Sequence, residues 1–491
     1  MKYFILLSIV AQLCSNAYPQ GRDANWVFGD SVGLYFGSDG SITSYPSVIK
    51  GFESQASISD SLGNLLFYTN GVNVWTYNHE VMSNGDGLEI GQIFWEDMGS
   101  SITQGVIILP TLKKPNEYYI FYIAYSIIPI DNFGLRYSIV DMNLNSGMGE
   151  VISKNISIYE GITTEKLSAI KHANGRDWWL ISRQRISGEP VDSLKFIKFL
   201  VSPNGIDGPY YQSYGAQNEW SYLNLGYYGE MVFSPQGDKL AYTAGTNLDI
   251  YDFDRCTGQL GHEKTIYDIA DQFTYGCAFS PDGNKIYVST FQSDNLYQYC
   301  LNCEKEIDST QELIYHVTGN YDIGQLELGP DNKIYFTTPY GEIPNEIYNV
   351  KTMNLCVINN PNELGLACDV DTNTIYLGGE RTLAGLPNMP NYNLGALAGS
   401  GCDTLTSVIQ SIENNHIQFY PNPAYEYIII SGEINPNDII KIYSADGRVV
   451  LHEKINTTNT KVDISMLPTG VYVIQISEDG WVKYSEKLFK E

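Results

Sequence analysis

The chain shows few of the residue patterns that are typical of nucleophilic, acid–base or metal-assisted chemistry. Its six histidines stand far apart and show no metal-ligand spacing. No His-Glu-x-x-His pair or phosphate-binding glycine loop occurs. Arginines are few and scattered, so a site that gathers guanidinium groups around an acid is not indicated either. The sequence therefore predicts no catalytic residues and no metal ligands, and it favours a binding protein over an enzyme.

Two short motifs each contain part of the ligand pattern of a metal site. Cys300-Leu-Asn-Cys303 has the spacing of half a zinc site, but no second pair at matching spacing accompanies it. Asp369-Val-Asp-Thr-Asn373 has the opening of a calcium loop, but Thr374 stands where such a loop needs a glycine. We interpret this segment as a turn before a strand over 374–377, with a calcium ion as the alternative. No other cofactor is expected.

Aromatic side chains are the better candidates for contact with a ligand. The stretch 70–79 alternates aromatic and polar residues, and the stretch 220–228 is rich in tyrosine. Such rings offer flat apolar faces with a polar edge, which suits a sugar or a peptide. Charged neighbours Glu165 and Lys166 form either an ion pair facing a channel or part of a solvated loop. The candidate ligand-binding residues are Trp75, Tyr77, Trp220, Tyr227 and Tyr228, and packing between sheets is the alternative for Trp75.

Composition limits the class of protein. A length of 491 residues allows two or three domains with ample core. Only 17% of residues are charged while 13% are aromatic, which argues against a disordered chain. The net charge of −27 repels phosphate backbones, so nucleic acid is excluded as an expected partner.

The first residues have the pattern of an export signal. Met1-Lys2 is a short basic start, and residues 4–13 form an apolar core too short to span a bilayer. Ser15-Asn16-Ala17 offers small residues at the positions that a signal peptidase reads, so cleavage is expected after Ala17. No other segment is long and apolar enough for a transmembrane helix, and none is expected in the mature protein.

Export through an oxidising compartment favours disulfides. The chain has eight cysteines, and loss of Cys14 with the signal leaves seven, an odd number whose connectivity the sequence does not fix. The expected pairs are Cys256 with Cys277 and Cys356 with Cys368.

A repeated unit runs through the middle of the chain. Each copy has a strand, a turn of Ser, Pro, Asp and Gly, and a second strand. Proline sets φ at the first corner, Asp or Asn caps the turn, and glycine accepts positive φ. Starts some 40–65 residues apart fit four-stranded blades, and one blade cannot bury both of its faces alone. Clear copies span 56–68, 232–242, 278–288 and 326–336, and weaker ones start near Val106, Leu167 and Cys368.

These copies predict an all-β fold, a β-propeller with seven blades, or with six or eight as alternatives. We expect the early strand over 26–36 to join the last blade and close the ring. The Ser-Pro-Asp-Gly copies resemble the WD40-like repeats of periplasmic TolB-like propellers. Further motifs are similar to those of secreted gliding-bacterial propellers, a resemblance that implies a destination and no activity; they are 25–29, 65–71, 137–142, 164–167, 253–258 and 385–387.

The last 75 residues or so form a separate unit. Short β-rich runs over 427–430, 439–443, 471–476 and 481–484 are separated by turn residues, which indicates a small Ig-like antiparallel sandwich. The order of its motifs resembles the C-terminal sorting domain of the type IX (Por) secretion system. The residues that carry the resemblance are Pro421, Asn422, Pro423, Asp446, Gly447, Arg448, Leu467, Gly470, Tyr472, Lys487 and Lys490.

This resemblance implies export across the outer membrane by the type IX machinery, with a secreted or cell-surface destination. The expected organisation is a signal peptide over 1–17, a propeller over 18–398, a linker over 399–415 and a sorting domain over 416–491. The predicted function is a binding scaffold for an extracellular protein or glycan. The alternative is an extracellular enzyme that acts on polysaccharide, with its site at the propeller channel.

Overall fold

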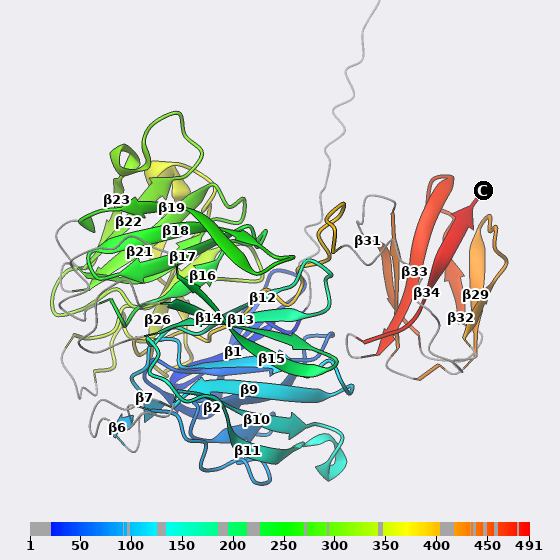
Figure 1. Cartoon of the computed structure of the whole chain (residues 1–491), viewed down its shortest axis with the longest axis horizontal. Helices are drawn as coiled ribbons and strands as arrows, with labels where there is room; N and C mark the ends of the chain where they lie inside the picture. Colours follow the sequence, from blue (N-terminus) through cyan, green and yellow to red (C-terminus); the bar gives the residue numbers. More distant parts are fainter. Residues whose placement is uncertain are drawn as a thin grey trace, which may run out of the picture.

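The structure is a computed structural model with two β-rich parts, one on each side of the linker (Figure 1). The signal peptide predicted over 1–17 and residues 403–415 of the predicted linker lie outside the described residues. The described residues are 21–402 and 417–491, except for 92, 96–98, 125–133, 185–194, 214–225, 270–272, 292–293, 342–346, 433, 436–437, 445–448, 456–459 and 479–480.

Five four-stranded antiparallel sheets make up most of residues 106–376. In each sheet the strands neighbour one another in chain order, as in the blades of a propeller. The sheets are β8(106–110)-β9(117–123)-β10(135–141)-β11(150–159), β12(168–171)-β13(178–183)-β14(195–202)-β15(205–213), β16(231–233)-β17(239–244)-β18(247–254)-β19(259–266), β20(273–279)-β21(285–291)-β22(295–300)-β23(312–316) and β24(326–328)-β25(334–336)-β26(354–358)-β27(370–376).

Smaller sheets complete the first part. Strand β1(25–36) pairs with β2(42–51), and β3(56–59), β4(65–69) and β5(74–76) form a three-stranded sheet. A short hairpin of β6(93–95) and β7(99–100) follows them. The all-β propeller fold predicted from the repeats is therefore confirmed, while the count of seven blades stays a prediction.

The repeated turn is built as its residue types predict. In the β20–β21 turn, the Ser280 hydroxyl donates to Asp282 at 2.5 Å, and the Ser280 amide donates to the Lys285 carbonyl at 2.9 Å. Gly283 closes the turn with φ of 68°, a conformation that is costly for other residues. The β16–β17 turn repeats this geometry, since Gly237 has φ of 74°.

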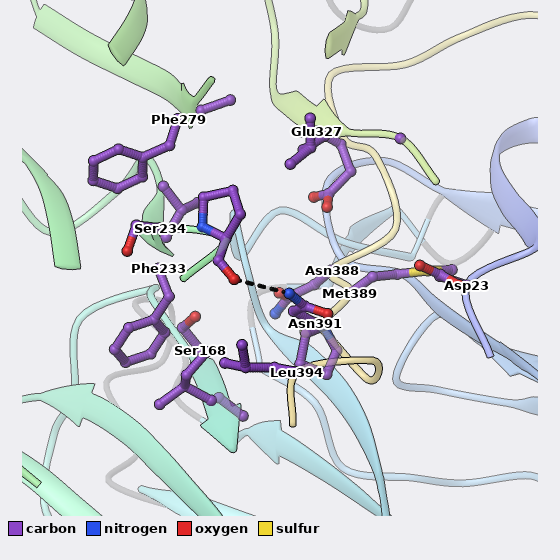
Figure 2. A pocket seen from close by; sticks show the side chains of 18 of the residues that line it. Asp23, Ser168, Phe233, Ser234, Phe279, Glu327, Asn388, Met389, Asn391 and Leu394 are labelled. Carbon is purple, nitrogen blue, oxygen red and sulfur yellow. Dashed lines mark hydrogen bonds between the residues drawn. The ribbon is translucent and has the colours of Figure 1, made fainter. Parts of the chain in front are cut away.

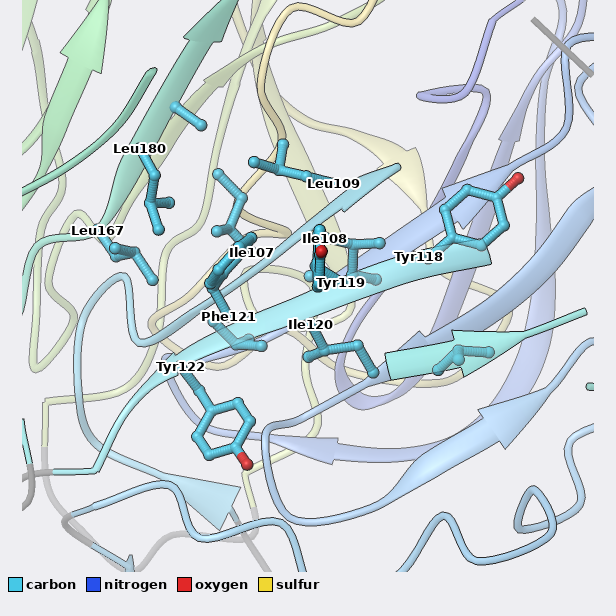
Figure 3. Packing of buried hydrophobic residues seen from close by; sticks show 14 of the residues in the cluster. Ile107, Ile108, Leu109, Tyr118, Tyr119, Ile120, Phe121, Tyr122, Leu167 and Leu180 are labelled. Carbon is cyan, nitrogen blue, oxygen red and sulfur yellow. The ribbon is translucent and has the colours of Figure 1, made fainter. Parts of the chain in front are cut away.

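Buried side chains join neighbouring sheets face to face in a closed circuit. The largest cluster links the β3–β5, β8–β11 and β12–β15 sheets, and Figure 3 shows Leu167 and Leu180 beside the side chains of β8 and β9. Four further clusters connect successive sheets onward to β24–β27 and from β1–β2 back to β3–β5. A last cluster closes the circuit, because Trp26 of β1 packs edge-on against Tyr335 of β25 with centroids 5.5 Å apart. Stacked sheets thus bury the faces that single blades would expose.

The early strand closes this ring differently from the prediction. The last sheet has only β24 to β27, and β1 pairs with β2 instead of joining it. On its other side β1 is bridged to residue 381, where the Asp30 amide donates to the Arg381 carbonyl at 3.0 Å. The strand is long enough to form its own sheet, so it closes the ring by packing its aromatic face on the neighbouring sheet.

The cysteine pairs also differ from the predicted ones. Cys256 is joined to Cys402, and Cys300 is joined to Cys303. Cys256 lies in the β18–β19 turn, whereas Cys277 is buried within β20 and has no access to that turn. Among the described residues the free cysteines are Cys277, Cys356 and Cys368, all buried.

The segment interpreted as a turn over 369–373 is mostly strand. Strand β27 begins at Val370, and a left-handed backbone is confined to Asp369, with φ of 60°, and to Asn373 within the strand, with φ of 57°. Glu380 does stand at the twelfth position of a calcium loop counted from Asp369. The extended strand nevertheless gives residues 370–376 a different backbone from such a loop.

The second part is a sandwich of two sheets around an isoleucine-rich core (Figure 1). One sheet has the order β28(418–420)-β29(427–431)-β32(460–463), and the other has β31(449–454)-β30(439–443)-β33(470–478)-β34(481–490). The predicted strands and the predicted sandwich are confirmed. No helix in the described part of the chain is long and apolar enough to cross a membrane.

Candidate functional site

The first strands of the sheets contact one another and so form the inner wall of the ring. Neighbouring pairs in contact are β3 with β8, β12 with β16, β16 with β20, and β20 with β24. A polar residue precedes or opens most of these strands, which brings side chains from distant segments to the ring axis. They include Gln55 before β3, Gln104 before β8, Glu165 before β12, Glu230 before β16 and Gln325 before β24.

Two glutamates meet at the end of the axis where the inner strands begin. Glu165 is buried, and its Oε2 accepts hydrogen bonds from the Thr103 amide at 3.2 Å and the Thr103 hydroxyl at 3.1 Å. Glu53 is half-buried and lies beside the same Thr103 hydroxyl and the Tyr275 hydroxyl. Four segments, the ones before β3, β8 and β12 and strand β20, therefore supply the carboxyl pair and the groups between its members.

The surroundings of the Glu53 carboxyl favour its protonated form. Burial, together with the nearby charge of Glu165, raises the pKa of Glu53 well above its ordinary value. Burial and the neighbouring carboxylates also raise the pKa of Tyr275, so its hydroxyl keeps its proton. The cluster therefore places an acid with a raised pKa beside a second, buried carboxyl group.

A third glutamate lies deeper in the axis. Glu230 is 2% exposed, and its Oε2 accepts hydrogen bonds from the Cys277 amide at 2.7 Å and the Leu326 amide at 3.2 Å. Burial raises the pKa of Glu230 to about 8, and the two amide donors only partly oppose that rise. Its side chain thus holds the start of β24 to the middle of β20.

The structure excludes one of the two arrangements that the sequence left open for Glu165 and Lys166. Both are buried, so the segment is not a solvated loop. Lys166 donates to the carbonyls of Gly226 and Thr243, each at 2.7 Å, and its ammonium lies 4.0 Å from the Tyr242 ring centroid. Burial lowers the pKa of Lys166 well below its ordinary value. Lys166 thus satisfies backbone acceptors.

Aromatic rings surround the outer edge of the carboxyl pair. Tyr227 and Tyr228 are half-buried and lie edge to face, with centroids 5.4 Å apart. The ring centroid of Tyr228 lies 6.4 Å from the ring centroids of both Phe273 and Tyr275. The Tyr227 carbonyl accepts from the Glu165 amide at 2.8 Å, which ties the rings to the carboxyl cluster. We call Tyr227, Tyr228 and Phe273 the aromatic rim.

The other predicted ligand-binding residues lie apart from this rim. Trp75 is 8% exposed and stacks on Tyr68 at 5.4 Å within the core between the first two sheets. Tyr77 is 44% exposed and follows the outer strand β5. Trp220 lies outside the described residues. The structure thus brings Tyr227 and Tyr228 together and separates both from Trp75 and Tyr77.

Sequence reasoning missed Glu53, Thr103, Glu230 and Tyr275. None of them belongs to a catalytic motif, because their partners come from other sheets. A usable signal was nevertheless present: acidic or hydroxyl residues recur directly before the apolar run that starts each repeat. Alignment of the repeats on their turns would have placed these residues near the starts of the inner strands.

The predicted sorting residues connect the first loop of the sandwich to its last strand. Asn422 donates to the Lys487 carbonyl at 2.8 Å and accepts from the Phe489 amide at 2.8 Å. Tyr472 donates to the Pro468 carbonyl at 2.7 Å, and Gly470 pairs with Lys490. Pro421 and Pro423 flank Asn422, and Leu467 packs on the sandwich core. Asp446, Gly447 and Arg448 lie outside the described residues.

Residues 418–491 match the family described as the secretion system C-terminal sorting domain. The predicted type IX tail is confirmed, and with it the secreted or cell-surface destination and the engagement of the type IX machinery. No protein with a curated function matches the chain.

Solved structures with similar architecture include several propellers and lactonases. A putative 6-phosphogluconolactonase from Bacteroides uniformis is 11% identical, covers 86% of this chain and 94% of its own, and has a TM-score of 0.38. The periplasmic gluconolactonase PpgL of Pseudomonas aeruginosa is 11% identical, with coverage of 80% and 96% and a TM-score of 0.36. The β-propeller domain of Cps50 (Swd1) from Myceliophteria thermophila is 12% identical, with coverage of 65% and 93% and a TM-score of 0.35. Similarity this low does not transfer an activity.

Proposed function

We propose that this exported protein is a binding scaffold for an extracellular glycan or protein, with the aromatic rim as its contact surface. The supporting observation is that Tyr227, Tyr228 and Phe273 are half-buried, adjacent rings, and that Tyr228 lies beside the Tyr275 ring and the Glu165 carboxyl of the cluster. Flat rings next to a few hydrogen-bonding groups are what carbohydrate sites use, because sugars present both apolar faces and hydroxyls. Among the two ligand classes this favours a glycan.

Binding to the rim is tested with the whole mature chain on a broad glycan array, followed by titration of the glycans it retains. Tyr227→Ala should weaken binding about tenfold, equivalent to about 1.4 kcal/mol for one lost ring contact. Tyr376→Ala is the matched control, since Tyr376 is 57% exposed on the outer strand β27. Equal affinity of the two variants would remove the rim from the site.

A second function, cleavage of polysaccharide, is supported by the carboxyl pair. Glu53 and Glu165 flank the Thr103 hydroxyl, and the pKa of Glu53 is raised by burial and by the nearby Glu165. Two carboxyl groups, one of them with a raised pKa, are the groups that glycoside cleavage requires. Glu53 would protonate the leaving oxygen, and Glu165 would act as base or nucleophile.

Product analysis on the glycans retained by the array separates the two functions. Release of shorter saccharides that stops with Glu53→Gln, while binding persists, would establish cleavage. Retention of intact glycan by the unaltered protein would leave the chain as a binding scaffold.

A further inference from the structure

A cavity of about 340 Å³ lies on the ring axis between β12, β16, β20, β24 and the segment 388–395 (Figure 2). Its lining residues come from the later parts of β16 and β20, whereas the aromatic rim lies where these strands begin. Small-molecule sites in proteins begin at about this size. The cavity is therefore a second candidate site, separate from the rim.

The segment that forms one wall of this cavity is held in place by its asparagines. Asn388 donates to the Leu167 carbonyl at 2.8 Å. Asn391 donates to the Pro235 carbonyl at 3.1 Å, the bond drawn in Figure 2. A wall fixed in this way makes the cavity a preformed site, which lowers the entropic cost of binding.

One carboxyl group in the wall lacks a partner. Glu327 of β24 is only half-buried, and Figure 2 shows its carboxyl directed toward the middle of the space. Among the described residues, none donates a hydrogen bond to this carboxyl or forms an ion pair with it. Burial raises the pKa of Glu327 well above its ordinary value, and the neighbouring carboxyls of Glu230 and Asp23 raise it further. The charged form of Glu327 therefore has no cation beside it.

The kind of cation that would fit follows from the rest of the wall. None of the described residues that line the cavity is Lys, Arg or His, so the cation comes from a ligand. A divalent metal ion requires several oxygen ligands, and the described residues hold no group of three side chains that could bind one. An ammonium is satisfied by one carboxylate and a few neutral acceptors. An anionic ligand would instead meet carboxyl groups alone.

Apolar side chains form a further part of the wall. Figure 2 shows Phe233, Met389 and Leu394 around the space toward which the Glu327 carboxyl points. These three side chains are half-buried, as are Val232 and Leu328 in the same wall. A ligand that removes such apolar surface from water gains free energy. The wall therefore matches a ligand that has an apolar body as well as a positive charge.

We propose that this cavity binds a small organic ammonium ion, whose protonated amine pairs with Glu327 and whose apolar body lies against Phe233, Met389 and Leu394. The site is independent of the aromatic rim and of the glycan proposed to bind there, because it lies at the other end of β16 and β20. The Glu327 carboxyl sets its selectivity. A neutral ligand of similar shape gains only the apolar contact, and an anion is repelled.

Calorimetric titration of the whole mature chain at neutral pH tests the site with three probes of similar shape and different charge: phenethylamine, phenethyl alcohol and phenylacetate. Phenethylamine should bind, phenethyl alcohol should bind about tenfold more weakly, and phenylacetate more weakly still. Glu327→Gln keeps the size of the side chain but removes its charge, so it should weaken phenethylamine about tenfold and leave phenethyl alcohol unchanged. Glu312→Gln is the matched control without effect, since Glu312 is exposed on the outer strand β23.

The proposal is overturned if phenethylamine does not bind, or if either of the other probes binds as tightly. Unchanged affinity for phenethylamine in Glu327→Gln overturns it as well. A thermal melt of each variant checks folding, and the three probes on the unaltered chain decide the matter if Glu327→Gln fails to fold. Tyr227→Ala should weaken capture of the array glycan and leave phenethylamine binding unchanged. Loss of both would place the amine at the rim and contradict the proposal.

Discussion

Glu230 makes the stability of the ring depend on pH in a direction opposite to that of most acidic groups. The pKa of Glu230 is raised by burial to about 8, against an ordinary value of 4.5. Between these two values the unfolded chain releases a proton that the folded chain keeps. Stability from this group is therefore complete below pH 4.5 and falls as pH rises toward 8. The loss at pH 7 is about 3 kcal/mol, because one pKa unit corresponds to about 1.36 kcal/mol.

Glu230→Gln removes this dependence with little change of shape. The amide oxygen of glutamine can still accept from the Cys277 and Leu326 amides, which the carboxyl oxygen accepts at 2.7 and 3.2 Å. The variant should match the unaltered protein at pH 4 and be more stable at pH 7 by about 2–3 kcal/mol. Glu53, Glu327 and Asp23 keep their own pH dependence in both proteins, so it cancels in the comparison.

Urea unfolding followed by tryptophan fluorescence measures the difference, since six of the seven tryptophans precede residue 221. The midpoint of the variant should move upward only at the higher pH. A variant that is destabilised equally at both pH values would refute the reasoning, because it would mean that Glu230 contributes through packing and not through its proton.

Three other substitutions give expected outcomes. Cys402→Ser opens the disulfide that closes 146 residues from Cys256, and should lower the unfolding free energy of the ring by at most about 5 kcal/mol. Asn422→Ala loses two hydrogen bonds to the last strand and should destabilise the sandwich by about 1–2 kcal/mol, seen as a shifted second transition and reduced surface delivery. Trp75→Ala should lower the free energy of unfolding by about 3–5 kcal/mol, whereas Tyr77→Ala should change it by no more than about 0.5 kcal/mol, because only Trp75 is buried.

Each of these three predictions has its own control or contradicting result. Cys300→Ser with Cys303→Ser opens a loop of 3 residues and should cost much less than loss of the long one. Truncation before Pro421 should leave the protein in the periplasm, and surface delivery of that form would contradict the role of the tail. Ligand loss in Trp75→Ala without loss of stability would move Trp75 from the core to a binding surface.

The propeller fold and the C-terminal tail could be predicted from local sequence patterns, because each depends on short-range geometry. The turn around Ser280, Asp282 and Gly283 needs residue types that sequence displays, and its spacing gives the repeat. The sandwich strands and Asn422 likewise belong to one compact unit of 74 matched residues, 418–491. The mode of ring closure by Trp26 escaped prediction, since it depends on which face of β1 meets another sheet.

The candidate sites could be predicted from the sequence only in small part. Tyr227 and Trp75 were both predicted as ligand-binding residues from the aromatic composition of their segments. Tyr227 does lie in the aromatic rim, but Trp75 is buried against Tyr68. The disulfide of Cys256 joins it to Cys402, 146 residues away, and no local pattern encodes that pairing. Composition identifies side chains able to bind a ligand, whereas burial decides which of them can be reached.

By itself the sequence determined the all-β class, the repeat, the separate tail and the exported destination, because turns, strand periodicity and sorting motifs are written in consecutive residues. Only the tertiary structure decided what meets at the axis. Glu53, Thr103 and Glu165 come from three sheets, and Asp23 faces Glu327 across a cavity that closure of the ring creates. Their pKa values and unpaired atoms arise from burial and proximity between distant segments, which a linear pattern does not contain.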